Sequence, residues 1–253
     1  MNMKYKHMVI PTSMAVLVIA AAVGYEGHNS NSKKKEIKGD YIAVSPDHFA
    51  NIYDSSVLVH RLLTLEEKCN DSAVMNHIGS GTLLQDSQTG TKYVLTAEHL
   101  TVNQSFICKE EDSPKERSIK IQKGKLTIAR LTATVLKENE SADQALLKIE
   151  GNIENTPFYK GKIAKQFHLG EYVIGVGYPS GKHTYFIANI TEREENWIIL
   201  NHSNKGGSSG GGIYRFGDQG FELIGTTRGG TAITSLERLQ ELIKGTPLED
   251  DYL

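Results

Sequence analysis

The chain is poor in cysteine and tryptophan, with two cysteines and one tryptophan among 253 residues. Neither the cysteines nor the nine histidines form a group with metal-ligand spacing, so we expect no metal and no other cofactor. An excess of one charge is also absent, since 28 basic and 30 acidic side chains give a formal net charge of −2. This balance excludes the broad basic surface on which nucleic-acid binding depends, so we expect no nucleic-acid partner.

Long apolar runs are confined to the N-terminus. Lys4 and Lys6 precede an apolar run over residues 8–24, which is the pattern of a secretory signal. We expect residues 1–24 to be a signal peptide cleaved before Tyr25 or an uncleaved membrane anchor, and a buried helix is the alternative. Either signal places the protein outside the cytoplasm, periplasmic or secreted, with a membrane tether through residues 8–24 in the second case. Residues 25–54, with a lysine run at 33–35, have the composition of a polar spacer and N-terminal extension.

The two cysteines, Cys69 and Cys108, are candidates for one disulfide, because export permits oxidation. The bridge would close a loop of 108 − 69 = 39 residues. The chain-entropy model gives such a loop a stabilisation of about 4 kcal/mol. Two buried thiols are the alternative, and the sequence does not decide between them.

Short β-rich runs separated by glycine-rich turns make up most of the chain after the spacer, with almost no helical periodicity. We expect strands over residues 56–62, 77–84, 92–96, 104–108, 118–122, 125–136, 145–149, 172–176, 183–191, 197–200, 213–216 and 221–226. Such a series of strands predicts an all-β fold, as a sandwich or a pair of barrels.

One helix is expected near the C-terminus, because apolar residues recur there at helical spacing. Thr234 and Glu237 fit a capping box at its start, and Gly245 with Pro247 should end it. The apolar face consists of Leu236, Leu239, Leu242 and Ile243.

Residues 205–212, Lys-Gly-Gly-Ser-Ser-Gly-Gly-Gly, place two serines inside a run of glycines. Glycines permit a tight turn and expose backbone N–H groups. A serine there is a candidate nucleophile, with those N–H groups stabilising the developing oxyanion. A flexible loop is the alternative. The stretch alone does not decide, since a serine nucleophile also needs a base and an orienting acid.

Two polar residues at strand ends supply candidates for these roles. His99 follows the expected strand over residues 92–96, and residues 79–82, Gly-Ser-Gly-Thr, stand upstream of it. Asp143 stands just before the apolar strand over residues 145–149, where its carboxylate can be partly buried and can hold an imidazole. Taken singly, a histidine or aspartate in such a place more often caps a turn.

Together these three segments resemble the chymotrypsin-fold serine proteases, especially their bacterial trypsin-like branch. The motifs Leu-Thr-Ala-x-His, Asp-x-Ala-Leu-Leu and Gly-x-Ser-Gly-Gly match residues 95–99, 143–147 and 207–211, in the order of that family. The resemblance covers roughly residues 55–245. It implies two antiparallel six-stranded β-barrels, over residues 55–155 and 156–253, packed with the active site between them, and a C-terminal α-helix.

The resemblance also implies a serine endopeptidase with polypeptide substrates. Ser209 would be the nucleophile, His99 the general base and Asp143 the group that orients it, while the N–H groups of Gly207 and Ser209 would form the oxyanion hole. Ser208 is the rival nucleophile. The α/β-hydrolase elbow also fits residues 207–211, but it requires a histidine after the serine, and none follows. The alternative function is a catalytically silent barrel pair that only binds peptides.

The chain departs from the family pattern at Glu98, Gln144 and Gly212, and its two cysteines do not match the family's disulfide that flanks the histidine. These departures remove no catalytic group, but they weaken any inference about close kinship or substrate.

The register of the family places Ser203 at the floor of the primary substrate pocket, with Thr227, Arg228 and Gly229 along its wall. Without an aspartate at the floor, a trypsin-like preference for lysine or arginine is not supported. Arg228 can accept an acidic substrate side chain or can simply be solvated.

Overall fold

The computed structural model describes residues 17–21, 40–64, 74–101, 105–108, 117–120, 125–128, 131–151, 156–217 and 220–253. Contacts divide the chain into two units, residues 1–50 and 51–253. In the first unit, β1 (Leu17–Ala21) pairs antiparallel with β2 (Asp40–Val44). Most of the expected signal segment and Cys69 lie outside the described residues, so the signal and the disulfide stay predictions. Among the described residues, no helix is long and apolar enough to span a membrane.

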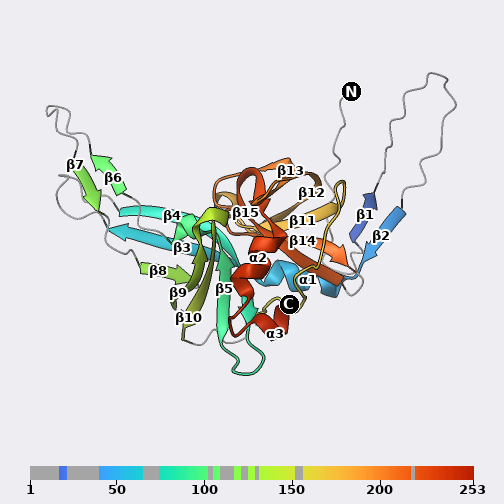
Figure 1. The fold of residues 1–253 in the computed structure, drawn as a ribbon, viewed down its shortest axis with the longest axis horizontal. Coiled ribbons are helices and arrows are strands. Elements are labelled where there is room, and N and C mark those ends of the chain that lie inside the picture. Colours follow the sequence, from blue (N-terminus) through green and yellow to red (C-terminus); the bar gives the residue numbers. More distant parts are fainter. Residues whose placement is uncertain are drawn as a thin grey trace, which may run out of the picture. The chain divides into compact units, whose positions relative to one another are not determined.

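The second unit begins within helix α1 (Pro46–Asp54) and contains two antiparallel sheets (Figure 1). The first sheet has the strand order β10-β5-β4-β3-β8-β9, and pairing of β9 with β10 closes it into a ring. Its strands are β3 (Ser56–Thr64), β4 (Val74–Gln85), β5 (Lys92–Thr96), β8 (Lys125–Ile128), β9 (Leu131–Asn139) and β10 (Gln144–Glu150). A separate pair is formed by β6 (Ser105–Cys108) and β7 (Arg117–Lys120).

The second sheet has the order β11-β12-β13-β15-β14, and β11 also pairs with β14, so this ring has five strands within the described part of the chain. Its strands are β11 (Tyr172–Gly177), β12 (Thr184–Arg193), β13 (Trp197–Asn204), β14 (Gly212–Gly217) and β15 (Gly220–Thr234). The prediction of strands as the dominant element and of a C-terminal helix is confirmed, whereas the count of six strands in the second sheet is wrong. The reason is that one long strand, β15, pairs with β14 along its first half and with β13 along its second.

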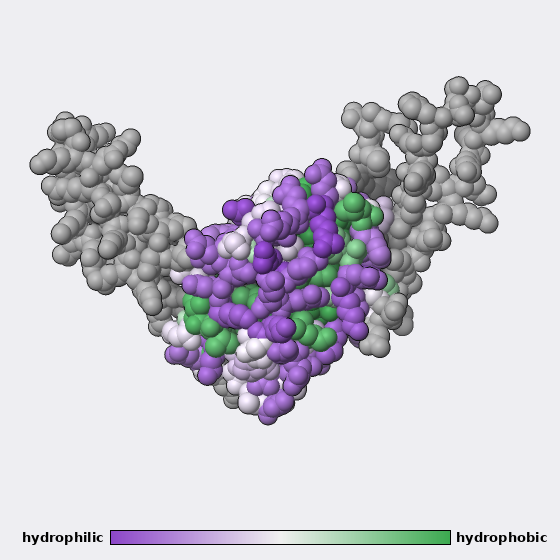
Figure 2. All heavy atoms as spheres, viewed as in Figure 1, coloured by the Kyte–Doolittle hydropathy of each residue, from purple (hydrophilic) through white to green (hydrophobic). Residues whose placement is uncertain are grey.

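Apolar side chains fill the inside of each sheet. Val59, Leu83 and Leu147 belong to one cluster in the first sheet, and each is at most 1% exposed. In the second sheet, Leu200 and Leu223 are buried to the same degree. On the face in Figure 2, apolar residues form small separate groups among hydrophilic ones. Burial of the apolar side chains inside each sheet is the main force that stabilises it.

The expected C-terminal helix is α2 (Leu236–Ile243), which contacts β9, β10 and β15 (Figure 1). Its four apolar residues are buried, and Gly245 follows it with a left-handed φ of +74°, as the sequence predicted. The capping box is wrong, because Ser235 is the N-cap residue. Thr234 lies in β15, where its hydroxyl accepts hydrogen bonds from Thr226 N–H and the Gln144 amide. A further short helix, α3 (Glu249–Tyr252), was not expected.

Candidate active site

His99 stands in a short 3₁₀ helix, η1 (Glu98–Leu100), directly after β5. Antiparallel pairing of β5 with β4 and β10 fixes the end of that strand, and therefore where the imidazole starts. The backbone N–H of His99 donates to Asp143 Oδ1 at 2.8 Å, and its ring Nδ1 lies 2.8 Å from Oδ2. Two bonds to one carboxylate therefore set both the position and the orientation of the ring. Because Nδ1 faces the carboxylate, Nε2 is left as the nitrogen that can take a proton.

Asp143 links η2 (Glu140–Ala142) to β10 and has a left-handed backbone, with φ of 50° and ψ of 48°. Asn139 supports this turn, because its side chain accepts a hydrogen bond from Ala142 N–H. Aspartate is one of the few side chains that tolerates this conformation. The residue is only 6% exposed. A buried carboxylate needs strong hydrogen-bond donors, and His99 provides two of them.

Arg228 is the third group at this carboxylate. Its Nε lies 3.6 Å from Asp143 Oδ2, and its guanidinium lies over the ring of Trp197, 4.4 Å from the centroid. The side chain is about half exposed, at 52%. Arg228 is thus held between an aromatic face and a buried acid, which favours a fixed guanidinium over a freely solvated one.

The Ser209 hydroxyl contacts the backbone of Arg228. Its Oγ donates a hydrogen bond to the Arg228 carbonyl at 2.9 Å. Within the described residues, no hydrogen bond joins this hydroxyl to His99. The structure therefore pairs His99 with Asp143 directly and links Ser209 to that pair through Arg228. Ser209 is partly exposed, whereas Ser208 is buried, with 5% of its surface exposed.

The carbonyl groups around Ser209 all have donors. Gly206 O accepts from Ser180 N–H at 2.8 Å, and Ser208 O accepts from Gly211 N–H at 2.9 Å. Ser80 supplies the other two, with its Oγ donating to Gly207 O at 2.7 Å and its N–H to Ser209 O at 2.7 Å. The N–H groups of Gly207 and Ser209, by contrast, have no acceptor within the described part of the chain. They are therefore free to bind an oxygen of a ligand.

Two glycines of this loop are needed for its shape. Gly207 has a φ of +89°, and a Cβ there would lie 2.6 Å from the Tyr178 carbonyl oxygen. Gly210 has a φ of +84°, and a Cβ there would clash with Ser80 O and Thr96 Oγ1. Side chains are thus excluded by both backbone conformation and space.

Glu98, beside the imidazole, is a buried acid with 7% of its surface exposed. Burial, and next the negative charge of Asp143, raise the pKa of the Glu98 carboxyl.

The lysyl endopeptidase C-terminal domain family matches residues 59–241, which is more than half of the chain. The chain belongs to this family. Among curated proteins, no match was found. Three solved structures resemble the chain at identities that show the fold alone, and this fold is that of the trypsin-like serine proteases.

The serine endoprotease from Yersinia pestis shares 19% identity with a TM-score of 0.51, over 83% of this chain and 68% of that one. An inactive mutant of Rv3671c from M. tuberculosis H37Rv shares 16% identity with a TM-score of 0.51, over 80% of this chain and 94% of that one. The HtrA-type protease AlgW, crystallised with a tripeptide, shares 18% identity with a TM-score of 0.50, over 78% of this chain and 63% of that one.

The four residues that the sequence assigned to a substrate pocket are differently placed in this lysyl endopeptidase-family chain. Arg228 and Gly229 adjoin Ser209, and a Cβ at Gly229 would meet no atom within 4 Å. Thr227 is 1% exposed, and its hydroxyl donates a hydrogen bond to Ser208 O in the Ser209 loop. Ser203 is exposed on β13. Arg228 and Gly229 thus border open space, whereas Thr227 lies beneath the loop.

Two residues of this region were missed by sequence reasoning. Asn204 is 9% exposed, and neither polar atom of its side chain has a partner among the described residues. Ser80 binds the Ser209 loop, and its only sequence signal is a serine between two glycines. Ser80 depends on contacts between distant segments, which no local pattern encodes.

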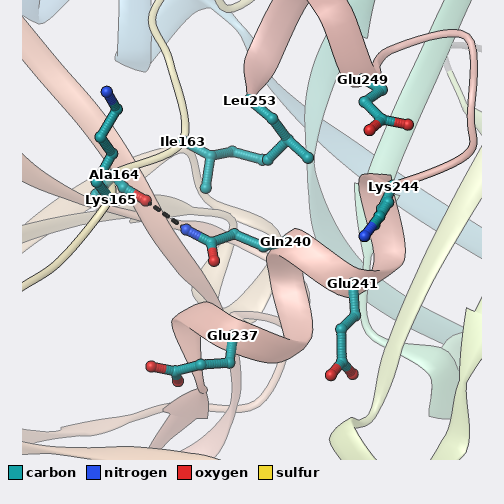
Figure 3. A pocket seen from close by; sticks show the side chains of 9 residues that line it. All are labelled: Ile163, Ala164, Lys165, Glu237, Gln240, Glu241, Lys244, Glu249 and Leu253. Atoms are coloured by element: carbon teal, nitrogen blue, oxygen red, sulfur yellow. Dashed lines mark hydrogen bonds between the residues drawn. The ribbon is translucent and has the colours of Figure 1, made fainter.

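Figure 3 shows a hollow elsewhere in the unit of residues 51–253, between α2 and residues 163–165. The side-chain amide of Gln240 donates across it to Ala164 O at 2.9 Å. Lysine and glutamate side chains both line it, and none of the candidate catalytic residues does. Charges of both signs without a nucleophile give no reason to place catalysis there.

Proposed function

We propose that this chain is a serine endopeptidase in which Ser209, His99 and Asp143 form the catalytic triad. The observation that carries the proposal is the double hydrogen bond of His99 to the buried carboxylate of Asp143. A histidine held through Nδ1 presents Nε2 as a base, which is what activation of a serine requires. Family membership and the free N–H groups beside Ser209 support it.

The reaction would begin when Ser209 Oγ turns from the Arg228 carbonyl towards His99. As Oγ attacks the substrate carbonyl carbon, Nε2 takes its proton, and the new oxyanion accepts hydrogen bonds from Gly207 and Ser209 N–H. Collapse of this intermediate breaks the C–N bond, and His99 protonates the leaving amine. Water then attacks the acyl-enzyme with His99 as base, which releases the acid and restores the serine hydroxyl.

We infer a substrate preference that differs from the lysine in the family's name. The Arg228 backbone carbonyl contacts Ser209, and its half-exposed guanidinium lies beside Asp143, so a lysine side chain placed near that guanidinium would meet charge of the same sign. An acidic or uncharged side chain would not be repelled. A peptide-library cleavage profile tests this inference, and cleavage only after lysine would contradict it. Arg228→Gln should then relax any selection against basic residues.

A second function, a binding module without catalysis, is favoured by one observation. The Ser209 hydroxyl bonds to the Arg228 carbonyl instead of the imidazole. In an enzyme this bond must break before attack, whereas in a binding module it would persist. Reaction with a fluorophosphonate distinguishes the two, since only an activated serine is phosphonylated.

The nucleophile is tested with Ser209→Ala. Turnover should fall by several orders of magnitude, towards the residual activity left by binding and the oxyanion hole. Fluorophosphonate labelling should disappear with it. Ser208→Ala is the matched control, because it removes a buried hydroxyl one residue away. It should keep both peptide turnover and fluorophosphonate labelling. Loss of labelling in Ser208→Ala with retention in Ser209→Ala would shift the nucleophile by one residue.

A further inference from the structure

Ser80 lies in β4 of the first sheet and is completely buried, with 0% of its surface exposed. All of its polar groups are bonded to segments far away in the sequence. Its N–H donates to Ser209 O, and its Oγ donates to Gly207 O, both at 2.7 Å. Its Oγ also accepts from Tyr178 N–H, at 2.7 Å. Ser80 therefore connects the first sheet to the loop of the candidate nucleophile.

The bond from Tyr178 determines which way the Ser80 hydroxyl donates. Because Tyr178 N–H donates to Oγ, the hydroxyl proton is left for Gly207 O. Gly177 packs closely against the Ser80 hydroxyl, since a Cβ at Gly177 would lie only 2.7 Å from Oγ. The Ser80 carbonyl accepts from Thr96 Oγ1, at 2.7 Å, three residues before His99. One residue thus touches the segments that carry the base and the nucleophile.

These bonds fix the peptide planes that flank the free N–H groups of Gly207 and Ser209. The Gly207 carbonyl shares a rigid peptide plane with the Ser208 N–H, and this plane lies between the two planes that carry the N–H groups of Gly207 and Ser209. Holding this middle plane therefore limits rotation of both of its neighbours. Ser80 holds two of the four carbonyls between Gly206 and Ser209. Its side chain holds that of Gly207, a glycine whose left-handed backbone would otherwise have wide conformational freedom.

We propose that Ser80 is a positioning residue that keeps the Gly207–Ser209 loop in the shape that binds an oxyanion. The inference rests on the proposed function, because it concerns the hole used in that reaction. Ser80 touches no substrate atom and acts through the loop. Preorganised donors contribute only when they already point to where the charge develops, so a loose loop loses transition-state binding while substrate binding persists.

Ser80→Ala removes the hydroxyl and keeps the backbone bond to Ser209. The expected result is a fall in kcat of about ten- to a hundredfold with KM within about twofold, less than loss of a whole oxyanion donor. The inhibition constant of a peptide aldehyde, whose adduct places an oxyanion in the hole, should rise by the same factor as kcat/KM falls. A purely structural role would not produce this parallel change.

Thr82→Val is the matched control. Thr82 lies two residues along the same strand, is also fully buried, and its hydroxyl bonds to Tyr214 OH at 3.1 Å. Its loss should lower the melting temperature but leave kcat and aldehyde binding unchanged. Ser80→Gly serves as the second variant where Ser80→Ala fails to fold, and the same losses are expected.

Three outcomes would overturn the proposal. Unchanged kcat and aldehyde affinity in both Ser80 variants would show that the loop holds its shape without the hydroxyl. A rise in KM alone would assign Ser80 to substrate binding. A wild-type protein that neither cleaves peptides nor reacts with a fluorophosphonate would refute the proposed function together with this inference, which separates that failure from the first two.

Discussion

Asp143 combines a left-handed backbone with a buried carboxylate, and each of these is unfavourable by itself. Its left-handed φ of 50° carries a conformational cost, and its buried carboxylate would be costly without donors. Both costs are offset by the bonds from His99 and by the guanidinium of Arg228 at 3.6 Å. Costs of this kind persist where the surroundings determine the geometry, and they gather at functional sites. Asp143 is therefore the residue whose chemistry is most worth testing.

Replacing Asp143 by asparagine keeps the shape of the side chain and its tolerance of a left-handed backbone. The amide cannot stabilise an imidazolium and can force the wrong tautomer on His99, so turnover should fall by about four orders of magnitude. The unfolding free energy should change much less than the activity. The measurement is kcat/KM on one peptide, with thermal unfolding of the same samples.

Asp86→Asn is the matched control for this change. Asp86 is another buried carboxylate, 4% exposed, which accepts a hydrogen bond from Gln88 N–H at 2.9 Å in the turn after β4. Its loss should affect stability and leave turnover near the wild-type value. An Asp143→Asn protein with nearly full activity would exclude Asp143 from this role and direct attention to Glu98.

The pairing of His99 with Asp143 was predictable from motif context, whereas the other long-range contacts of this site were not. His99, Asp143 and Ser209 stand in short segments with a recognisable order, and the structure pairs the first two directly. The contacts of Arg228 with Trp197 and Asp143 join segments separated by tens of residues. Ser80 likewise bonds to the Ser209 loop and to Tyr178, which lie far away in the sequence.

Short β-rich runs bounded by turns were also predictable, and β5 has the bounds that the sequence predicts. The interpretation failed for β15, which runs over 15 residues where only 221–226 were expected. Gly229 and Gly230 have positive φ within it, and its partner changes from β14 to β13 along its length. A strand that bends and changes partners loses the regular pattern on which such a prediction depends.

Hydrogen bonds to distant segments explain why the sequence misplaces the start of α2. Thr234 is a good N-cap residue in isolation, but its hydroxyl is already bonded within the sheet by Thr226 N–H and by Gln144. The helix consequently starts after Ser235, with Thr234 kept as the last residue of β15. Tertiary hydrogen bonds here override a local capping signal.

Across the unit of residues 51–253, Tyr252 of α3 joins distant parts of the chain. Its hydroxyl donates to Tyr159 O at 2.9 Å and accepts from Gln85 N–H at 3.0 Å, at the end of β4. Its own carbonyl accepts from Ile163 N–H at 2.9 Å. The first sheet, the segment before the second sheet and α3 therefore meet at one side chain, which sequence patterns gave no reason to single out.

Burial raises the pKa of the Tyr252 hydroxyl to about 12, from an ordinary value of 10.0. Since the unfolded chain releases this proton first, the stabilisation is complete below pH 10 and is lost as the pH rises towards 12. Tyr252→Phe should lower the unfolding free energy by roughly 1–3 kcal/mol at pH 8, because Gln85 N–H loses its acceptor. The difference between the two proteins should then shrink as the pH rises from 10 to 12.

Urea unfolding of both proteins between pH 8 and 12 measures this difference. Burial raises the pKa of Tyr159 and Tyr214 as well, so the comparison with the phenylalanine variant is what isolates Tyr252. Tyr172→Phe, at the start of β11, removes a hydroxyl that takes part in none of these bonds, and the variant should have the unfolding free energy of the wild type at pH 8. A stability difference for Tyr252→Phe that stays constant up to pH 12 would mean that its hydroxyl is solvated in the folded protein, and α3 would then contribute through apolar packing alone.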